Sequence, residues 1–372
     1  MRKGGTAMQA GLLDTYGTAI SRRAAPAWIL SALLFASYIL LYFGPLPRLG
    51  LRFDVFQRAA EALHLGSKWT LYGLLYTLAI TLGGLFVLRR HGNSPYQRIR
   101  TLCVVAVQVV FAFALPLVMQ VFGRREYYFS YFWPLKIEYL YPSVILQQPF
   151  LILAWSFLGS LVAFPLLAYF LGKRFYCSWI CGCGGLANTA GEPFRHLSNK
   201  SVGAWRVEKV SVHAVLFLAV VTTAIVWVNW AIGKQHPEFS RFAFGVQQWY
   251  GFAIGAMFAG VLGVGLYPLM GTRVWCRFGC PMAALLGLVQ KFGRFRITVK
   301  KDMCIACGNC STYCEMGIDV RQYAMANQDV KRAACVGCGM CAHVCPRGVL
   351  KLENTPVRFR AGEPIRVYAV DL

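Results

Sequence analysis

Long apolar stretches separated by short polar connections form the main pattern of this chain. Six stretches are long enough to cross about 30 Å of hydrocarbon. Beyond residue 272 the pattern changes to short alternating segments, "RFRITVK" and "GVLKLEN", which are typical of β-strands. The pattern predicts a mainly α-helical protein: a polytopic membrane domain of about six transmembrane helices, followed by a small C-terminal α+β domain. The six stretches lie at roughly residues 27–45, 69–88, 101–122, 148–172, 210–232 and 250–271.

Composition supports a membrane protein. The chain is 57% hydrophobic and its mean hydropathy is +0.49, which is rare among soluble globular chains. The net charge of +23 would suit a nucleic-acid partner if the cations formed one basic face. Instead, Lys and Arg lie between the apolar stretches, as expected of residues that flank membrane helices. The expected surroundings are lipid, with no nucleic-acid partner.

The distribution of Lys and Arg also predicts an orientation. The segments 1–26, 89–100 and 173–209 carry more of them than the alternate connections do, and such segments face the cytoplasm. The basic region after residue 272 lies on the same side. The first 26 residues have no immediate apolar run with a cleavage site, so they are interpreted as a cytoplasmic leader. We expect a multi-pass protein of the bacterial inner membrane with both termini in the cytoplasm.

The strongest chemical signal is a pair of C-x2-C-x2-C-x3-C motifs. They read "CIACGNCSTYC" from residue 304 and "CVGCGMCAHVCP" from residue 335. This spacing lets three thiolates bind one [4Fe–4S] cluster while the fourth cysteine reaches the neighbouring cluster. A zinc site would use two pairs of ligands instead. Residues 273–353 are therefore expected to form a two-cluster domain of the bacterial ferredoxin type that passes single electrons. The predicted ligands are Cys304, Cys307, Cys310 and Cys345 for one cluster, and Cys335, Cys338, Cys341 and Cys314 for the other.

A second cysteine pattern is repeated within the membrane domain, residues 27–272. "GKRFYCSWIC" at 172–181 matches "GTRVWCRFGC" at 271–280, each directly after an apolar stretch and expected at the inner face. Paired repeats commonly build one site at their interface. Cys177 and Cys181, with Cys276 and Cys280, would supply four thiolates for a third cluster or another soft metal. Reduced structural cysteines remain the alternative.

A polytopic domain with two such motifs, followed by a two-cluster ferredoxin unit, resembles the NapH/NosR type of membrane polyferredoxin over roughly residues 148–353. The resemblance implies an electron-transfer subunit that works between the quinone pool and a protein redox partner. Cys276-x3-Cys280-Pro281 matches the family motif in full. In the first copy Gly182 replaces the proline and Cys183 is an extra cysteine, which leaves open whether Cys181 or Cys183 is the partner of Cys177.

Several points stay open at this level. The aromatic connection 123–142 could form an interfacial belt or the wall of a quinone pocket. Glu315 stands where the first ferredoxin motif would normally have proline. An assembly reductase for a metal such as copper, or a redox sensor, would use the same motifs, although the tail at 354–372 is too short for a further β-domain. No nucleotide loop or catalytic set is visible, so the chain is interpreted as a subunit rather than a complete enzyme. Electron direction, oligomeric state and partner identity do not follow from the sequence.

Overall fold

The computed structural model describes residues 19–45, 53–123, 126–233 and 235–354, with side chains described from residue 25 onward. Most of the leader expected at 1–26 lies outside the described residues. So does the tail expected at 354–372, apart from Asn354.

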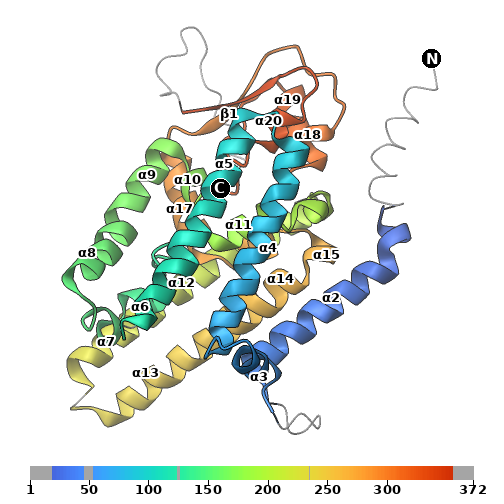
Figure 1. The fold of residues 1–372 in the computed structure, drawn as a ribbon. Coiled ribbons are helices and arrows are strands. Elements are labelled where there is room, and N and C mark those ends of the chain that lie inside the picture. Colours follow the sequence, from blue (N-terminus) through green and yellow to red (C-terminus); the bar gives the residue numbers. More distant parts are fainter. Residues whose placement is uncertain (1–18, 46–52, 124–125, 234, 355–372) are drawn as a thin grey trace.

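Within the described residues, six helices are long and apolar enough to cross a membrane. The mainly helical, polytopic architecture is therefore confirmed, and Figure 1 shows these helices running obliquely side by side. Three of the six agree with the expected ranges within three residues, and two begin earlier than expected, at Pro95 rather than 101 and at Val202 rather than 210. The sixth runs from Pro237 to Gly265 rather than from 250 to 271. The spans are built from α2 (Ala19–Phe43), α4 (Lys68–His91), α5 (Pro95–Val109) with η3 (Val110–Ala114) and α6 (Leu115–Val121), α8 (Phe150–Leu158) with η5 (Gly159–Ala163) and α9 (Phe164–Leu171), α12 (Val202–Ile232), and α13 (Pro237–Tyr250) with η7 (Gly251–Leu262) and α14 (Gly263–Gly265).

Prolines follow two of the irregular turns within these spans. The π-helical turns η3 and η5 end just before Pro116 and Pro165. A proline lacks the N–H for an intrahelical bond and clashes with the preceding turn, so the helix widens locally. Pro268 does not lie inside a span, because the chain breaks after α14 and Pro268 begins the separate helix α15 (Tyr267–Met270).

The cysteine repeat lies deeper than the inner end of the spans. The helix α10 (Arg174–Cys177) lies within the first copy of the repeat, and α11 (Gly182–Asn188) directly follows it. Gln108, halfway along its span, donates a hydrogen bond from Nε2 to the carbonyl of Ile180 at 2.6 Å. In Figure 1, α11 crosses α4 near the middle of that helix. The expected inner-face position is therefore corrected: the chain turns back after α9 and enters the helix bundle.

The remaining short helices connect the spans or surround this inserted segment. They are α3 (Val55–Ala62), η4 (Ile137–Leu140), α7 (Pro142–Ile145), η6 (Glu192–Leu197), α16 (Val274–Phe278) and α17 (Pro281–Phe292).

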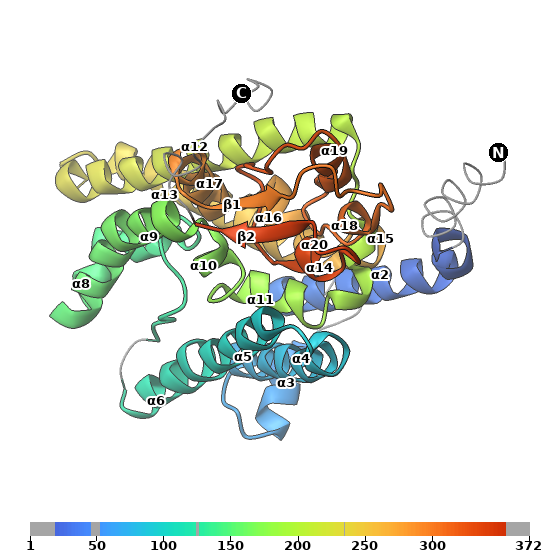
Figure 2. The ribbon, with the colours of Figure 1, turned by 90° about the horizontal axis from the view of Figure 1, so that it is seen from above.

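The C-terminal part is a small α+β unit, as expected. Strands β1 (Arg296–Val299) and β2 (Leu350–Glu353) pair antiparallel, with Arg296 opposite Glu353 and Val299 opposite Leu350. Viewed from above (Figure 2), this unit lies over the short helices at the centre of the bundle. One apolar core joins the two parts, since Phe164 and Cys276 belong to the same buried cluster as Cys335. The unit also contains α18 (Asn309–Thr312), α19 (Val320–Met325) and α20 (Met340–His343).

Candidate functional site

The two ferredoxin motifs adopt the same backbone conformation. Gly308 (φ 83°) and Gly339 (φ 75°) occupy equivalent left-handed positions directly after the second cysteine of each motif. Glycine reaches this region without the steric cost that a side chain imposes. The turn lets three cysteines of one motif surround a common point.

Backbone amides approach the last cysteine of each motif in the same way. The amide of Ile318 donates to Cys314 Sγ, and the amide of Val349 donates to Cys345 Sγ, each at 3.4 Å. Hydrogen bonds to sulfur stabilise the anionic thiolate and tune the potential of iron–sulfur centres. The matched pattern fits cysteines that bind clusters as thiolates.

The first predicted ligand set surrounds one cavity of about 360 Å³. The cysteines at its walls come from the first motif and from the end of the second, which is the three-plus-one combination expected from the spacing. Cys307 is exposed, so this cavity lies toward the solvent side of the domain. The cysteines that line it are Cys304, Cys307, Cys310 and Cys345.

The second predicted set lies deeper. Cys335 and Cys341 are buried, and the thiol of Cys341 interacts electrostatically with those of Cys338, Cys335 and Cys314. Cys314 is thus brought to the cysteines of the other motif rather than to those of its own. This set lies on the side of the domain that faces the membrane bundle.

The membrane repeat converges as well. Cys280 interacts electrostatically with Cys276, Cys181 and Cys177, and all four are buried. The two copies share a local bond, because the amide of Cys181 donates to the Tyr176 carbonyl at 2.8 Å and that of Cys280 to the Trp275 carbonyl at 2.9 Å. The copies therefore meet as two halves of one site.

Cys183 occupies a different place from its neighbour. It lies in the first turn of α11, whereas Cys181 and Cys280 both stand at the residue just before a helix. The thiol of Cys183 is hydrogen-bonded to that of Cys181. Cys181 is therefore the structural counterpart of Cys280, and Cys183 is an additional thiol beside it.

A buried charge network connects the membrane cysteines to the inner ferredoxin set. Arg273 lies with Nη1 3.6 Å from Cys276 Sγ and with Nη2 2.9 Å from Glu315 Oε1. The other oxygen of Glu315 forms an ion pair of 3.0 Å with Arg195 Nη1, at an angle outside hydrogen-bond geometry. The same nitrogen of Arg195 lies 3.7 Å from Cys338 Sγ. Burial raises the pKa of Glu315, but the two arginines outweigh this effect and hold it below its usual value.

The network continues away from the cysteines through Glu192. Its carboxylate pairs with Arg195 at 2.6 Å and lies 3.1 Å from His91 Nε2, while His91 Nδ1 lies 3.2 Å from His343 Nε2. Burial raises the pKa of Glu192, but the charge of Arg195 and the bond to His91 lower it to about 2. The carboxylate is therefore ionised over the physiological range.

Gln290 is a second connection that sequence reasoning missed. Its Nε2 donates to the carbonyls of Arg332 and Cys335, both at 2.9 Å, and its Oε1 accepts from the Lys173 amide at 2.7 Å. One buried side chain thus holds both a membrane cysteine motif and the second ferredoxin motif. A glutamine in an apolar helix gives no signal of this in the sequence.

The donor set fits iron–sulfur clusters. Among the described residues, no group of three or more His, Cys, Asp or Glu side chains lies close enough to share a single metal ion. Cluster ligands need no such proximity, because each thiolate binds a different iron at a corner of the cube. The apolar cavity, the amide-to-sulfur bonds and the nearby arginines all suit anionic clusters.

Comparison with known proteins agrees with this chemistry. The model of a 4Fe-4S dicluster domain matches residues 297–352, and that of a 4Fe-4S binding domain matches twice, at 153–201 and 251–300. The second model therefore covers both copies of the membrane repeat.

The curated relatives include a ferredoxin-type protein and a putative electron transport protein. The chain is 29% identical over 180 residues to the methylamine utilization ferredoxin-type protein MauN of Paracoccus denitrificans, which covers 45% of this chain and 61% of the relative. It is 27% identical over 167 residues to the putative electron transport protein YccM of Escherichia coli, covering 43% of this chain and 46% of the relative. The chain thus spans about three fifths or less of the length of these relatives. No solved structure gives a significant match.

The chain accordingly contains 4Fe-4S ferredoxin-type domains and is similar to ferredoxin-type proteins. It combines 4Fe-4S domains with helices suited to a multi-pass membrane protein, as in a polyferredoxin-like membrane protein.

Proposed function

We propose that this chain relays electrons between the quinone pool and a protein redox partner through three cysteine sites in series. The path begins at the four membrane cysteines, continues to the inner ferredoxin set and ends at the outer set with its exposed Cys307. The observation that carries the proposal is the chain of contacts from Cys276 through Arg273, Glu315 and Arg195 to Cys338. Such continuity keeps two sites adjacent at a fixed separation.

The ligand sets proposed for the two ferredoxin clusters are those expected from the spacing. The first is Cys304, Cys307, Cys310 and Cys345, and the second is Cys335, Cys338, Cys341 and Cys314. For the membrane site we propose Cys177, Cys181, Cys276 and Cys280, with Cys183 as a neighbour rather than a ligand. This choice rests on the matched positions of Cys181 and Cys280 before α11 and α17.

Bound clusters would supply one-electron chemistry. The surrounding residues set the electrostatic charge next to the thiolates and exclude water from the inner sites. Arg273 and Arg195 place positive charge beside Cys276 and Cys338, which favours the anionic thiolates. Glu315 offsets part of that charge. The apolar core around the inner sites excludes water, so these charges interact more strongly than they would in solvent.

The quinone end of the path is proposed near the aromatic connection. Tyr176, next to Cys177, donates from its hydroxyl to the carbonyl of Ser130 at 3.0 Å. The connection thus reaches the first cysteine motif, which an interfacial belt alone would not require. The orientation, with the ferredoxin domain in the bacterial cytoplasm, is proposed from the bias of Lys and Arg.

The test combines metal analysis with quinol-driven reduction. After anaerobic purification, three clusters would give about twelve iron atoms per chain, and two would give about eight. The double variant Cys276→Ser/Cys280→Ser should lose about four irons and the quinol-driven reduction of the ferredoxin clusters. Cys103→Ser is the matched control, because this thiol lies in α5 outside the three sites. Unchanged iron and unchanged reduction in the double variant would contradict the relay.

A further inference from the structure

A cationic cavity opens where the membrane domain meets the ferredoxin domain. It measures about 560 Å³ including its open mouth, and it lies between the first turns of α12, the helix α17 and the loop at 332–334. Five of its lining side chains are cationic and only Glu208 is acidic. The cations are Lys173, Lys209, Lys291, Arg277 and Arg332.

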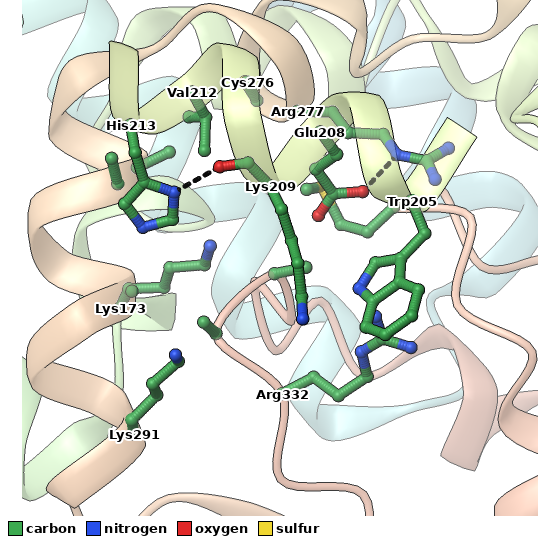
Figure 3. A pocket seen from close by; sticks show the side chains of 16 residues that line it. Lys173, Trp205, Glu208, Lys209, Val212, His213, Cys276, Arg277, Lys291 and Arg332 are labelled. Atoms are coloured by element: carbon green, nitrogen blue, oxygen red, sulfur yellow. Dashed lines mark hydrogen bonds and ion pairs between the residues drawn. The ribbon is translucent and has the colours of Figure 1, made fainter. Parts of the chain in front are cut away.

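The single carboxylate does not balance this charge. Glu208 Oε2 is 2.6 Å from Arg277 Nε, so these two groups form their own pair. No second acidic residue lines the cavity. Lys209 and Arg332 each lie over the ring of Trp205, at 4.2 Å and 4.8 Å from its centroid, and this contact leaves their positive charge in place. Figure 3 shows the side chains of Lys173, Lys209 and Lys291 pointing toward a common region. Like charges that converge in a partly desolvated space repel one another unless an anion lies between them.

Lys173 supplies positive charge at the inner end of the cavity. The residue is only 2% exposed, and its ammonium group interacts electrostatically with the thiols of Cys177 and Cys335. An anion in the cavity would therefore be attracted by a buried cation as well as by the cations at the mouth.

The position of the cavity indicates the source of the anion. It lies at the end of α12 where the span begins, which is the depth of lipid headgroups. Exposed apolar side chains continue from it toward the hydrocarbon, since Phe217 is one turn beyond His213 and Phe292 is next to Lys291. A ligand suited to both parts has an anionic head and an apolar tail.

We propose that this cavity binds the phosphate headgroup of an anionic membrane lipid, next to Cys276. Lys209, Lys291 and Arg332 contact the phosphate from the mouth, and Lys173 contacts it from the interior. His213 donates from Nδ1 to the Lys209 carbonyl at 2.6 Å, which leaves Nε2 available to the headgroup. The bound lipid would also close the cavity to water on the side of the membrane cysteines.

The test is native mass spectrometry of the full chain, purified anaerobically in detergent, with phosphatidylglycerol or phosphatidylcholine added at equal concentration. Phosphatidylglycerol should bind more tightly, and the variant Lys209→Gln/Lys291→Gln should weaken it about 25-fold, because each cation near a headgroup contributes about fivefold. Phosphatidylcholine binding should change little. The control is Arg89→Gln/Arg90→Gln, since these exposed cations end the span α4 outside the cavity.

Iron content measured on each variant checks that it is folded, and Lys291→Gln alone replaces the double variant if iron is lost. Equal binding of the two lipids, or equal loss in the control, would overturn the proposal. A separate arm adds inorganic phosphate. Displacement of phosphatidylglycerol by inorganic phosphate at the same concentration would show a site for a free anion and would also overturn the assignment to lipid.

Discussion

Arg273 and Glu315 form a buried ion pair of 2.9 Å between the membrane cysteine repeat and the first ferredoxin motif. Arg273 belongs to the second copy of the repeat, and Glu315 directly follows Cys314. The pair thus joins the two kinds of cysteine motif. It also gives a physical role to Glu315, which takes the place of the usual proline.

Replacement of Glu315 by Gln should raise the reduction potential of the inner cluster by tens of millivolts. The substitution removes a negative charge, and a more positive surrounding favours the reduced cluster, which carries one more electron. It also leaves Arg273 buried without a carboxylate, whereas Arg195 keeps its pair with Glu192, and the unpaired Arg273 should destabilise the fold by about 3–5 kcal/mol. A redox titration followed by EPR measures the potential, and thermal unfolding measures the stability.

Two further variants separate charge from backbone shape. Glu315→Pro restores the usual motif residue but should still raise the potential, because the charge is absent. Glu315→Asp keeps the charge and should shift the potential least. If the proline variant behaved like the unmodified chain, the turn rather than the charge would control the potential.

Cys181→Ser should empty the membrane site, whereas Cys183→Ser should leave it occupied. The reason is that Cys181 stands in the position equivalent to Cys280, while Cys183 lies in the turn of α11 that follows. Iron per chain should fall by about four in the first variant only. The reverse result would assign the ligand role to Cys183.

Gln290→Ala should loosen the contact between the ferredoxin domain and the membrane domain. The change leaves the Cys335 carbonyl and the Lys173 amide without their partner, whereas the Arg332 carbonyl still accepts from the Cys335 amide at 3.0 Å. Each unsatisfied group costs about 1–3 kcal/mol. Limited proteolysis should then cut faster between β1 and β2. Gln290→Glu is the informative comparison, since its carboxylate still accepts from Lys173 but cannot donate to the carbonyls. Equal proteolysis rates in all three chains would contradict this role.

Glu192→Gln should lower the melting temperature by the same amount at pH 6 and at pH 8. The folded pKa of about 2 lies below the ordinary value of 4.5, so the stabilisation is fully present above about pH 4.5. It is lost only as the pH falls from there toward 2, and by linkage it is about 3 kcal/mol. A clear difference between pH 6 and pH 8 would mean that the carboxylate titrates in that range.

Removal of iron by a chelator under oxidising conditions should unfold residues 297–352 while the spans stay helical. Among the described residues, the two strands of this region pair with each other and form one bridge to Val330, and seven of the eight ferredoxin cysteines lie in or against the core. Small metal-binding domains commonly lose their fold with the metal. Proteolysis of this region, with little change in helical circular dichroism, is the expected result. Continued protease resistance without iron would contradict it.

Most of the fold could be predicted from the long apolar stretches and the cysteine spacing of the sequence. Twenty-residue apolar stretches leave few alternatives to membrane helices, and the cysteine spacing required a compact two-motif domain. The inserted position of α10 and α11 could not be predicted in this way. Their residues are apolar whether they end at the inner face or enter the bundle, and only contacts such as Gln108 with Ile180 distinguish the two positions.

The site was predictable in its cysteines but not in its charges. Cysteines at this fixed spacing are typical of cluster ligands, whereas Arg195, Arg273 and Lys173 look like ordinary flanking cations in the sequence. Their role depends on contacts across 42 to 143 positions of the chain. The replacement of proline by Glu315 was the one visible sign, and its meaning required the position of Arg273.

The shared apolar core of the two domains restricts where a redox partner can exchange electrons with the chain. Cys276 and Cys335 belong to one packed cluster, and Ser178 donates to the carbonyl of Val336 at 2.7 Å. The ferredoxin domain is therefore packed in a fixed position on the membrane domain and does not move between separate electron donors and acceptors. A redox partner would therefore have to bind at the edge near Cys307. The rates of its association and dissociation, rather than a domain movement, would then limit the rate of electron transfer.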